Sequence, residues 1–150
     1  MYVEPGRGLV GRAAVALYRV VGTKRVPHVR TFVAVDGGMA DNIRPTAYGA
    51  KYSAVLANRA DDRGVPIDVA IAGKYCETGD ILIQHVSLPL PKIGDLVAIP
   101  AAGAYQLSMA NNYNMALRPA VVVVAKGHAR IVRRRETYED LLRAEVMAER

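Results

Sequence analysis

Short runs of apolar, β-branched residues recur along the chain, and their pattern predicts a mainly β protein. In residues 29–35 (VRTFVAV) the odd-numbered side chains share one face by alternation, which is the period of a strand. Similar runs follow, each bounded by turn formers such as Lys126-Gly127. These further strands are predicted at residues 67–73, 80–84, 95–99 and 120–125. Short strands at this spacing favour an antiparallel β-sandwich or a Greek-key, barrel-like domain over repeated βαβ units.

Helices are predicted to be few and short. One is expected from Gly8 to Ala14 and a second from Ala104 to Ala110. The clearest signal begins at Thr137, because Asp140 stands three residues after it, as in an acidic variant of the capping box. The apolar residues that follow mark one face of a helix expected to last nearly to Arg150.

Three stretches between the strands contain more glycine and polar side chains than simple turns need. Each combines glycine with charged, hydroxyl or amide side chains, and they are Val35 to Ala50, Ala72 to Asp80 and Ala101 to Asn114. Glycine lets a backbone adopt positive φ or approach a ligand closely, and binding residues gather on loops above a rigid sheet. We therefore expect binding residues on these three loops.

Composition adds limits to this picture. With 150 residues, 51% hydrophobic and 23% charged, the chain fits one globular domain, or one domain plus a remnant of another. Its longest apolar runs are far shorter than a membrane span, so no membrane partner is expected. The net charge of +6 raises nucleic-acid binding as an alternative. The basic residues are scattered, apart from Arg133-Arg134-Arg135, and no nucleic-acid motif accompanies them.

Metal and disulfide chemistry find little support in the sequence. Cys76 is the only cysteine, which excludes an internal disulfide and a cysteine zinc cluster and suits a reducing cytoplasm. His28, His85 and His128 lie far apart and lack companions at ligand spacing. We therefore expect a cytoplasmic protein with no metal site.

Four groups of residues are candidates for binding or catalysis. Glu4-Pro5-Gly6-Arg7 precedes a predicted helix, so its backbone N–H groups and arginine suit a phosphate, or else form an ordinary helix-starting turn. Arg44 and Tyr48 would share a helical face and clamp a carboxylate, or else form a surface pair. Cys76-Glu77 is a third candidate, although a lone cysteine is more often an inert small core residue than a reactive one. Tyr105 is the fourth, with a core aromatic whose hydroxyl is hydrogen-bonded as its alternative.

The order of these segments resembles one family. EPGR, VDGGMADNIRPTAYGA, YCETGD, GDLVAIPAAGAYQLSMANNYN and IVRRRETYEDLL follow one another from Glu4 to Leu142 as in the diaminopimelate decarboxylases. These are pyridoxal-phosphate (PLP) enzymes of the alanine racemase-like fold group. Five segments in order are more specific than any one alone. CETGD and the Arg44/Tyr48 pair look closer to this branch than to the decarboxylases that act on ornithine or arginine.

The resemblance implies a domain organisation. Enzymes of this family have an amino-terminal (β/α)8 barrel and a carboxyl-terminal β-domain, and they work as homodimers. Residues 1–14 would then be a remnant of the last strand and helix of the PLP-binding barrel, and residues 15–150 the carboxyl-terminal β-domain. The rest of the barrel, with the lysine that binds the cofactor, would be absent from this chain. Barrel-facing apolar surface would be exposed, which predicts a homodimer or higher oligomer, and a separate barrel-domain chain is a further possible partner.

The resemblance also implies a role for each candidate. Glu4, Pro5, Gly6 and Arg7 match contacts to the phosphate of pyridoxal 5'-phosphate, with Arg7 also touching substrate. Tyr105 matches a residue that contacts cofactor and substrate, although Gln106 beside it stands where relatives often carry glycine. The substrate's distal carboxylate would meet Arg44 and Tyr48, and its distal amino group Glu77. Cys76 matches the proton donor, and with Glu77 it would reach into the partner subunit's site.

These inferences lead to one function and one alternative. The chain is expected to be the carboxyl-terminal domain of a diaminopimelate decarboxylase, which converts meso-2,6-diaminopimelate to L-lysine and carbon dioxide in lysine biosynthesis. By itself it is expected to be inactive, because the cofactor's lysine lies elsewhere. The alternative is a stand-alone, non-catalytic ligand-binding or assembly domain that kept the β-fold.

Overall fold

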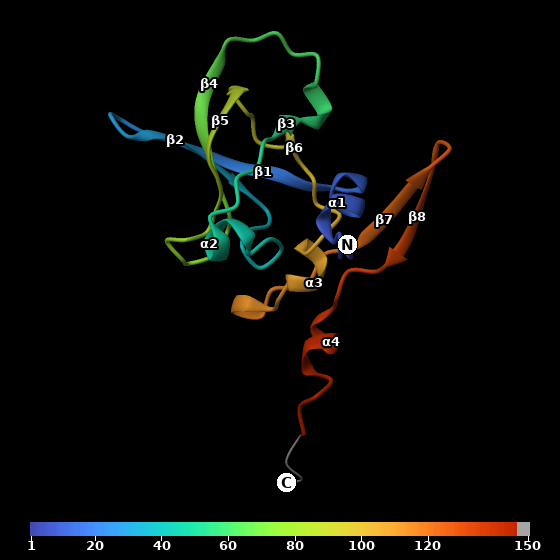
Figure 1. The fold of residues 1–150 in the computed structure, drawn as a ribbon. Helices are drawn as coiled ribbons and strands as arrows, with labels where there is room; N and C mark the ends of the chain where they lie inside the picture. Colours follow the sequence, from blue (N-terminus) through green and yellow to red (C-terminus); the bar gives the residue numbers. More distant parts are fainter. Residues whose placement is uncertain (147–150) are drawn as a thin grey trace. The chain divides into compact units, whose positions relative to one another are not determined.

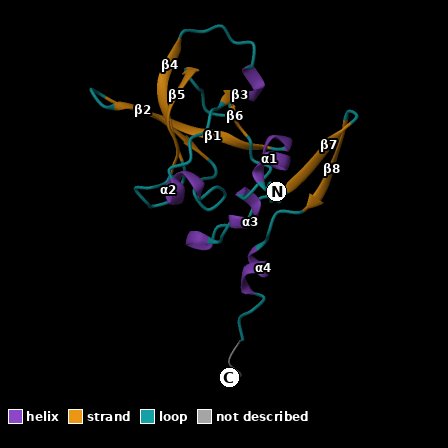
Figure 2. Cartoon of the chain, viewed as in Figure 1, coloured by secondary structure: helices purple, strands orange, loops and turns teal. Residues whose placement is uncertain are grey.

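The computed structural model describes residues 1–146, and their contacts divide the chain into two compact units (Figure 1). Unit 1 runs from Met1 to Ala110, and unit 2 begins at Asn111. Strands dominate and the helices are short (Figure 2). The prediction of a mainly β protein with a few short helices is therefore confirmed.

A single curled, mixed sheet forms the body of unit 1. Its strands are β1 (Val15–Val26), β2 (Arg30–Val35), β3 (Val55–Leu56), β4 (Pro66–Ala72), β5 (Ile81–Pro89) and β6 (Leu96–Pro100). They lie in the order β3-β6-β1-β2-β4-β5 and make a half-barrel. Neighbours are antiparallel except β2 and β4, which are parallel, so the purely antiparallel expectation fails at this pair. The long connection between those two strands supplies the crossover that a parallel pair requires.

The longest strand, β1, is absent from the sequence prediction. Its apolar pattern is interrupted by Gly22, Lys24 and Arg25, so the pattern did not predict a strand here. Its first half pairs with β6 and its second half with β2, and the register shifts between Val20 and Gly22. One strand thus joins the two halves of the sheet. A residue left out of the ladder at such a bulge bends the strand, which suits a curled sheet.

The core of unit 1 lies on the inner face of this sheet. Val33 and Val35 of β2 are fully buried, as alternation predicted, and they pack with buried residues from every other strand. Val29 does not share that face, because β2 begins only at Arg30 and Val29 is 65% exposed in the preceding turn. The buried cluster comprises Tyr18, Val20, Val33, Val35, Ala54, Leu56, Val69, Ile71, Leu82, Ile83, Leu88, Val97 and Ile99.

Short helices flank the sheet of unit 1. They are α1 (Arg7–Val10), α2 (Arg44–Tyr48) and α3 (Gln106–Met109), with 3₁₀ helices at Gly11–Ala13 and Ala57–Arg59. The helix expected over residues 8–14 is therefore split into an α turn and a 3₁₀ turn. The helix expected over residues 104–110 starts only after Tyr105, whose left-handed backbone (φ 64°) cannot continue a helix.

Unit 2 contains a β-hairpin followed by one helix. Strands β7 (Val121–Ala125) and β8 (His128–Arg133) pair across Lys126 and Gly127, which both have positive φ, as a type I′ turn requires. A 3₁₀ helix spans Tyr113–Met115. Helix α4 (Tyr138–Leu142) follows the hairpin and carries the predicted capping box between Thr137 and Asp140. It ends at Leu142, sooner than expected, and the last part of the prediction, residues 147–150, lies outside the described residues.

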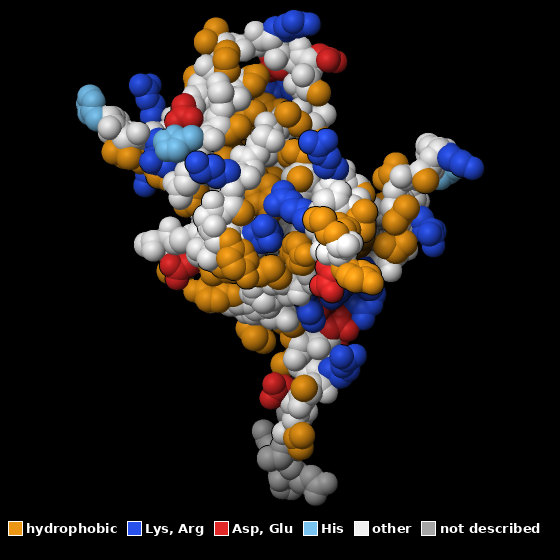
Figure 3. Space-filling view, in the orientation of Figure 1, with side chains coloured by type: hydrophobic (Ala, Val, Ile, Leu, Met, Phe, Trp, Pro, Cys, Tyr) orange, Lys and Arg blue, Asp and Glu red, His pale blue; other side chains and the backbone are white. Residues whose placement is uncertain are grey.

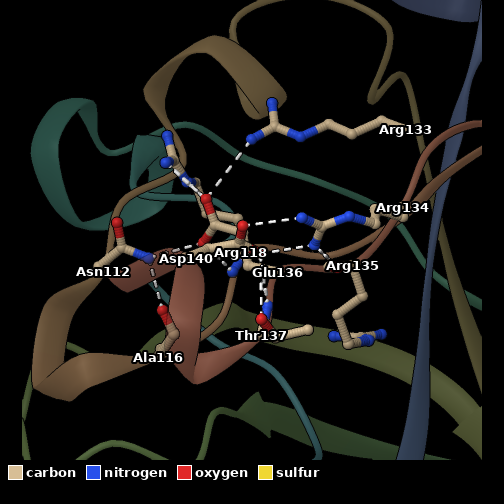
Figure 4. Close-up of polar contacts among 9 residues, drawn as sticks. All are labelled: Asn112, Ala116, Arg118, Arg133, Arg134, Arg135, Glu136, Thr137 and Asp140. Atoms are coloured by element: carbon tan, nitrogen blue, oxygen red, sulfur yellow. Dashed lines mark hydrogen bonds and ion pairs between the residues drawn. The ribbon is translucent and has the colours of Figure 1, made fainter. Parts of the chain in front are cut away.

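An ionic network centred on Glu136 organises the rest of unit 2 (Figure 4). The Glu136 carboxylate accepts the Arg118 backbone N–H at 2.9 Å and the Asn112 side-chain amide at 2.8 Å. Burial disfavours its ionised form, but these donors and the Arg118 guanidinium outweigh that effect and lower the pKa of Glu136. Beside it, the guanidinium of Arg134 binds both oxygens of Asp140. The run Arg133-Arg134-Arg135 therefore has two roles: part of it faces solvent, and Arg134 links α4 to the hairpin.

Candidate functional site

Helix α2 holds Arg44 among aromatic rings. The helix is short because Pro45 stands in its first turn and Gly49 ends it with left-handed backbone (φ 62°). Arg44 and Tyr48 share one face, and the guanidinium carbon lies 5.6 Å from the centroid of the Tyr48 ring. It lies 5.6 Å from the centroid of the Tyr105 ring as well. Cation–π attraction to both rings therefore holds the Arg44 guanidinium beside Tyr48 and Tyr105.

Tyr105 connects this arginine to the amino-terminal segment. Its left-handed backbone is uncommon for a residue with a bulky side chain, and such conformations gather at functional sites. The side chain is 46% exposed, and its hydroxyl packs directly against Gly6. A Cβ placed on Gly6 would lie 2.1 Å from that oxygen, so a larger residue there would displace the Tyr105 side chain. The structure thus brings the Glu4–Arg7 segment, Tyr105 and Arg44 together.

Tyr52 is a member of this cluster that the sequence reasoning missed. Its hydroxyl accepts a hydrogen bond from Nε of Arg44 at 3.2 Å, and its ring faces the guanidinium carbon of Arg7 at 5.6 Å. It follows Tyr48 by four residues, but the helix has already ended at Gly49, so this spacing carried no signal. Among residues 1–146, neither Arg7 nor Arg44 has a carboxylate partner.

The loop that carries Cys76 and Glu77 is anchored by Asp80. This carboxylate is 3% exposed and accepts the Met39 N–H at 2.7 Å and the Tyr75 N–H at 2.8 Å. Gly38 and Gly73 line its pocket, where an added Cβ would meet the carboxylate at 2.5 Å and 2.2 Å. Burial raises the pKa of Asp80 above its ordinary value, although both N–H donors oppose that shift. Two of the three glycine-containing loops are therefore joined through one side chain.

Cys76 and Glu77 themselves face outward. Cys76 is exposed, and Glu77 accepts hydrogen bonds from the Thr78 hydroxyl and the Gly79 N–H, both at 3.2 Å. The Thr46 hydroxyl of α2 donates to the Gly79 carbonyl at 2.8 Å. Through that bond, the loop is tied to the helix that bears Arg44 and Tyr48. Within the described residues, neither Cys76 nor Glu77 contacts the arginine–tyrosine cluster.

Tyr75, on the loop of Cys76, and Tyr18, in the core, are both held in the neutral form. Burial, followed by the charges of Asp41 and Asp80, raises the pKa of Tyr75 to about 12. Burial and Asp41 also raise the pKa of Tyr18 far above its ordinary value, while its hydrogen bond from Gln106 opposes the shift. Gln106 is thus a buried partner of the core.

Other kinds of site are not apparent in the described part of the chain. Residues 1–146 contain no group of three His, Cys, Asp or Glu side chains placed to hold a metal ion. No helix among them is long and apolar enough to cross a membrane. On the face seen in Figure 3, Lys and Arg side chains form several separate groups instead of one continuous stripe. A backbone-tracking nucleic-acid surface would need such a stripe.

Comparison with known proteins gives one consistent family. Residues 10–103 match the family model described as pyridoxal-dependent decarboxylase, C-terminal sheet domain. The chain is 50% identical over 150 residues to the diaminopimelate decarboxylase of Synechocystis sp., covering all of this chain and 32% of that protein. It is 54% identical over 149 residues to that of Bacillus subtilis, covering 97% of this chain and 33% of that protein.

The fold is similar to solved structures with the same description. The diaminopimelate decarboxylase of M. jannaschii, in co-complex with L-lysine, superimposes with a TM-score of 0.85 at 37% identity. The match covers 97% of this chain and 32% of that one. The chain therefore spans about a third of the length of the relatives that it matches.

Proposed function

Because this chain belongs to the pyridoxal-dependent decarboxylase family, as a C-terminal sheet domain, we propose that it forms the substrate-recognition side of a diaminopimelate decarboxylase. The reaction converts meso-2,6-diaminopimelate to L-lysine and carbon dioxide. The observation that carries the proposal is the cluster of Arg44 with Tyr48 and Tyr105, and of Arg7 with Tyr52. Both arginines lie against tyrosine rings and have no carboxylate partner among residues 1–146, so they attract a ligand with anionic groups.

Arg44 and Tyr48 bind the distal carboxylate of the substrate in this proposal. None of the described residues accepts a hydrogen bond from the terminal nitrogens of Arg44, so both are available to a carboxylate. Glu77 receives the distal amino group, which completes recognition of a ligand with a charged group at each end. A lysine or ornithine molecule lacks the second carboxylate and leaves Arg44 unpaired, which is how such sites discriminate.

The residues around Gly6 fit the phosphate end of pyridoxal 5'-phosphate. Gly6 has no side chain to block approach and packs against Tyr105, and Arg7 has no ion-pair partner among the described residues. Glu4 and Pro5 complete this exposed segment. The bound cofactor supplies an electron sink for the pair of electrons left when carbon dioxide departs. Cys76 then donates its thiol proton to the carbon that lost the carboxyl group, as a general acid.

We also propose that the active form is a homodimer. Cys76 and Glu77 face solvent on a loop that Asp80 fixes, and within residues 1–146 they do not touch the cluster around Arg44. Their exposure supports an arrangement in which this loop enters the site of a second copy. Cofactor-side and loop-side residues of one site then come from two subunits.

A chimera tests the proposed function. The matching third of the Bacillus subtilis relative would be replaced by this chain, and carbon dioxide release from meso-2,6-diaminopimelate measured. We expect activity, and an Arg44→Ala chimera should show KM raised by roughly 10–100-fold, because a charged hydrogen-bond partner contributes about 1.5–3 kcal/mol. A folded chimera that binds the cofactor but releases no carbon dioxide would refute the proposal.

The isolated chain is the matched control. With pyridoxal 5'-phosphate added, it should form no lysine above a no-protein blank. Turnover by the chain alone would show that one of its own five lysines, Lys24, Lys51, Lys74, Lys92 or Lys126, can hold the cofactor.

A further inference from the structure

We infer that Tyr52 is a positioning residue that sets the direction of both arginines, Arg7 and Arg44. This inference rests on the proposed function, because it concerns how the same site grips its ligand. Tyr52 lies between the end of α2 and the start of β3, in a stretch without regular structure. It is half-buried and packs against the hydrophobic core, so its ring is held from below.

The Tyr52 hydroxyl determines which edge of the Arg44 guanidinium faces a ligand. A guanidinium can meet a carboxylate side-on, through Nε and one terminal nitrogen, or end-on, through its two terminal nitrogens. In this structure, Nε donates to the Tyr52 hydroxyl at 3.2 Å. The side-on approach is therefore blocked, and the end-on pair remains. The Tyr48 and Tyr105 rings hold the position of the guanidinium carbon but leave its rotation in the ring plane free.

The Tyr52 ring has a second, separate contact with Arg7. The guanidinium carbon of Arg7 lies 5.6 Å from the ring centroid, and Arg7 makes no ion pair within residues 1–146. One side chain therefore uses its oxygen for one arginine and its aromatic face for the other. Two like charges are kept at a fixed separation, which favours a ligand that presents two anionic groups at the matching distance.

The two contacts can be separated by substitution. Tyr52→Phe removes the hydroxyl and keeps the ring, so it should release Arg44 and leave Arg7 in place. Tyr52→Leu removes both contacts. Tyr138→Phe is the matched control, because Tyr138 is an exposed tyrosine of unit 2 that loses only a hydroxyl.

Side-chain NMR of the 150-residue chain gives a readout that a general loss of stability would not reproduce. The Arg44 Nε–H resonance is identified by its loss in Arg44→Lys. The proton that gives it should exchange with solvent roughly tenfold faster in Tyr52→Phe than in the wild type. The Arg7 resonance should stay unchanged in Tyr52→Phe and shift in Tyr52→Leu. Tyr138→Phe should alter neither. An unchanged Arg44 exchange rate in Tyr52→Phe would overturn the inference.

Ligand titration separates this inference from the proposed function. Adding meso-2,6-diaminopimelate should move the Arg44 resonance in the wild type, and Tyr52→Phe should weaken that binding by about five- to tenfold. Binding of L-lysine, which lacks the distal carboxylate, should change by less than twofold in the same variant. If diaminopimelate leaves the wild-type resonance unmoved, the isolated chain does not bind the substrate by itself; the chimera then still tests the proposed function, and the exchange rates still decide the role of Tyr52. If both ligands weaken equally, Tyr52 does not set selectivity and the inference is refuted.

Discussion

Replacing Asp80 with alanine should destabilise unit 1 more than the loss of a surface carboxylate would. The Asp80 side chain accepts the backbone N–H groups of Met39 and Tyr75, at 2.7 Å and 2.8 Å, and is 3% exposed. Alanine leaves two buried donors without acceptors, and each such donor costs about 1–3 kcal/mol. Part of this is offset because burial of the carboxylate is itself unfavourable, as its raised pKa indicates. We expect the free energy of unfolding to fall by about 2–4 kcal/mol.

Urea denaturation, followed by far-ultraviolet circular dichroism, measures this change directly. Asp61→Ala is the matched control, because Asp61 is exposed and makes no hydrogen bond among the described residues, so it should cost less than about 0.5 kcal/mol. Amide hydrogen exchange adds a local readout. The Met39 and Tyr75 amides should lose protection in Asp80→Ala, while amides in the β1–β2 ladder keep theirs. Equal stabilities for the two variants, with both amides still protected, would refute the role assigned to Asp80.

Three further outcomes follow from single contacts. Burial opposes ionisation of Asp95, but hydrogen-bond donors led by the Lys92 N–H outweigh that effect and lower the pKa of Asp95. The ionised carboxylate therefore stabilises the fold above the pKa that Asp95 has in the unfolded chain, and this stabilisation is lost as the pH falls through its pKa in the folded protein. The stability gap between wild type and Asp95→Asn, measured by urea titration, should therefore narrow in acid. Gly103→Ala should lower the free energy of unfolding, measured by thermal denaturation, by at least about 2 kcal/mol, because the new Cβ would lie 1.9 Å from a backbone carbonyl oxygen. Gly22→Ala is the control: its Cβ would meet open space, so the loss should be far smaller. Glu136→Ala should speed amide exchange at residue 118, whose N–H it accepts, and leave exchange in unit 1 unchanged.

The candidate site was recovered from the sequence in part. Arg7, Arg44, Tyr48 and Tyr105 were singled out, and the structure brings them together in one cluster, in which Tyr52 contacts both arginines. Their catalytic and binding roles stay predictions that the chimera tests. Tyr52 was missed, because it reaches Arg44 only after the chain has turned at Gly49. The exposed loop of Cys76 and Glu77 was identified, but its dependence on buried Asp80 was not.

Local chemistry explains what the sequence determined by itself. β-Branched runs bounded by turn formers identified five strands, and Thr137 with Asp140 identified the start of α4. Each of these signals lies within a few residues along the chain. The same holds for the Lys126-Gly127 turn, where two adjacent residues of positive φ determine the hairpin.

Tertiary packing decided the rest. Strand β1 contains charged and glycine residues, and it is a strand because β2 and β6 supply partners for its backbone on either side. The parallel pairing of β2 with β4 joins residues 38 positions apart, and the Met39 N–H that Asp80 accepts lies 41 positions before it. The gathering of Arg7, Arg44 and Tyr105 at one tyrosine-rich site likewise joins residues far apart along the chain. Contacts over such separations depend on the complete curl of the sheet, and no window of neighbouring residues contains them.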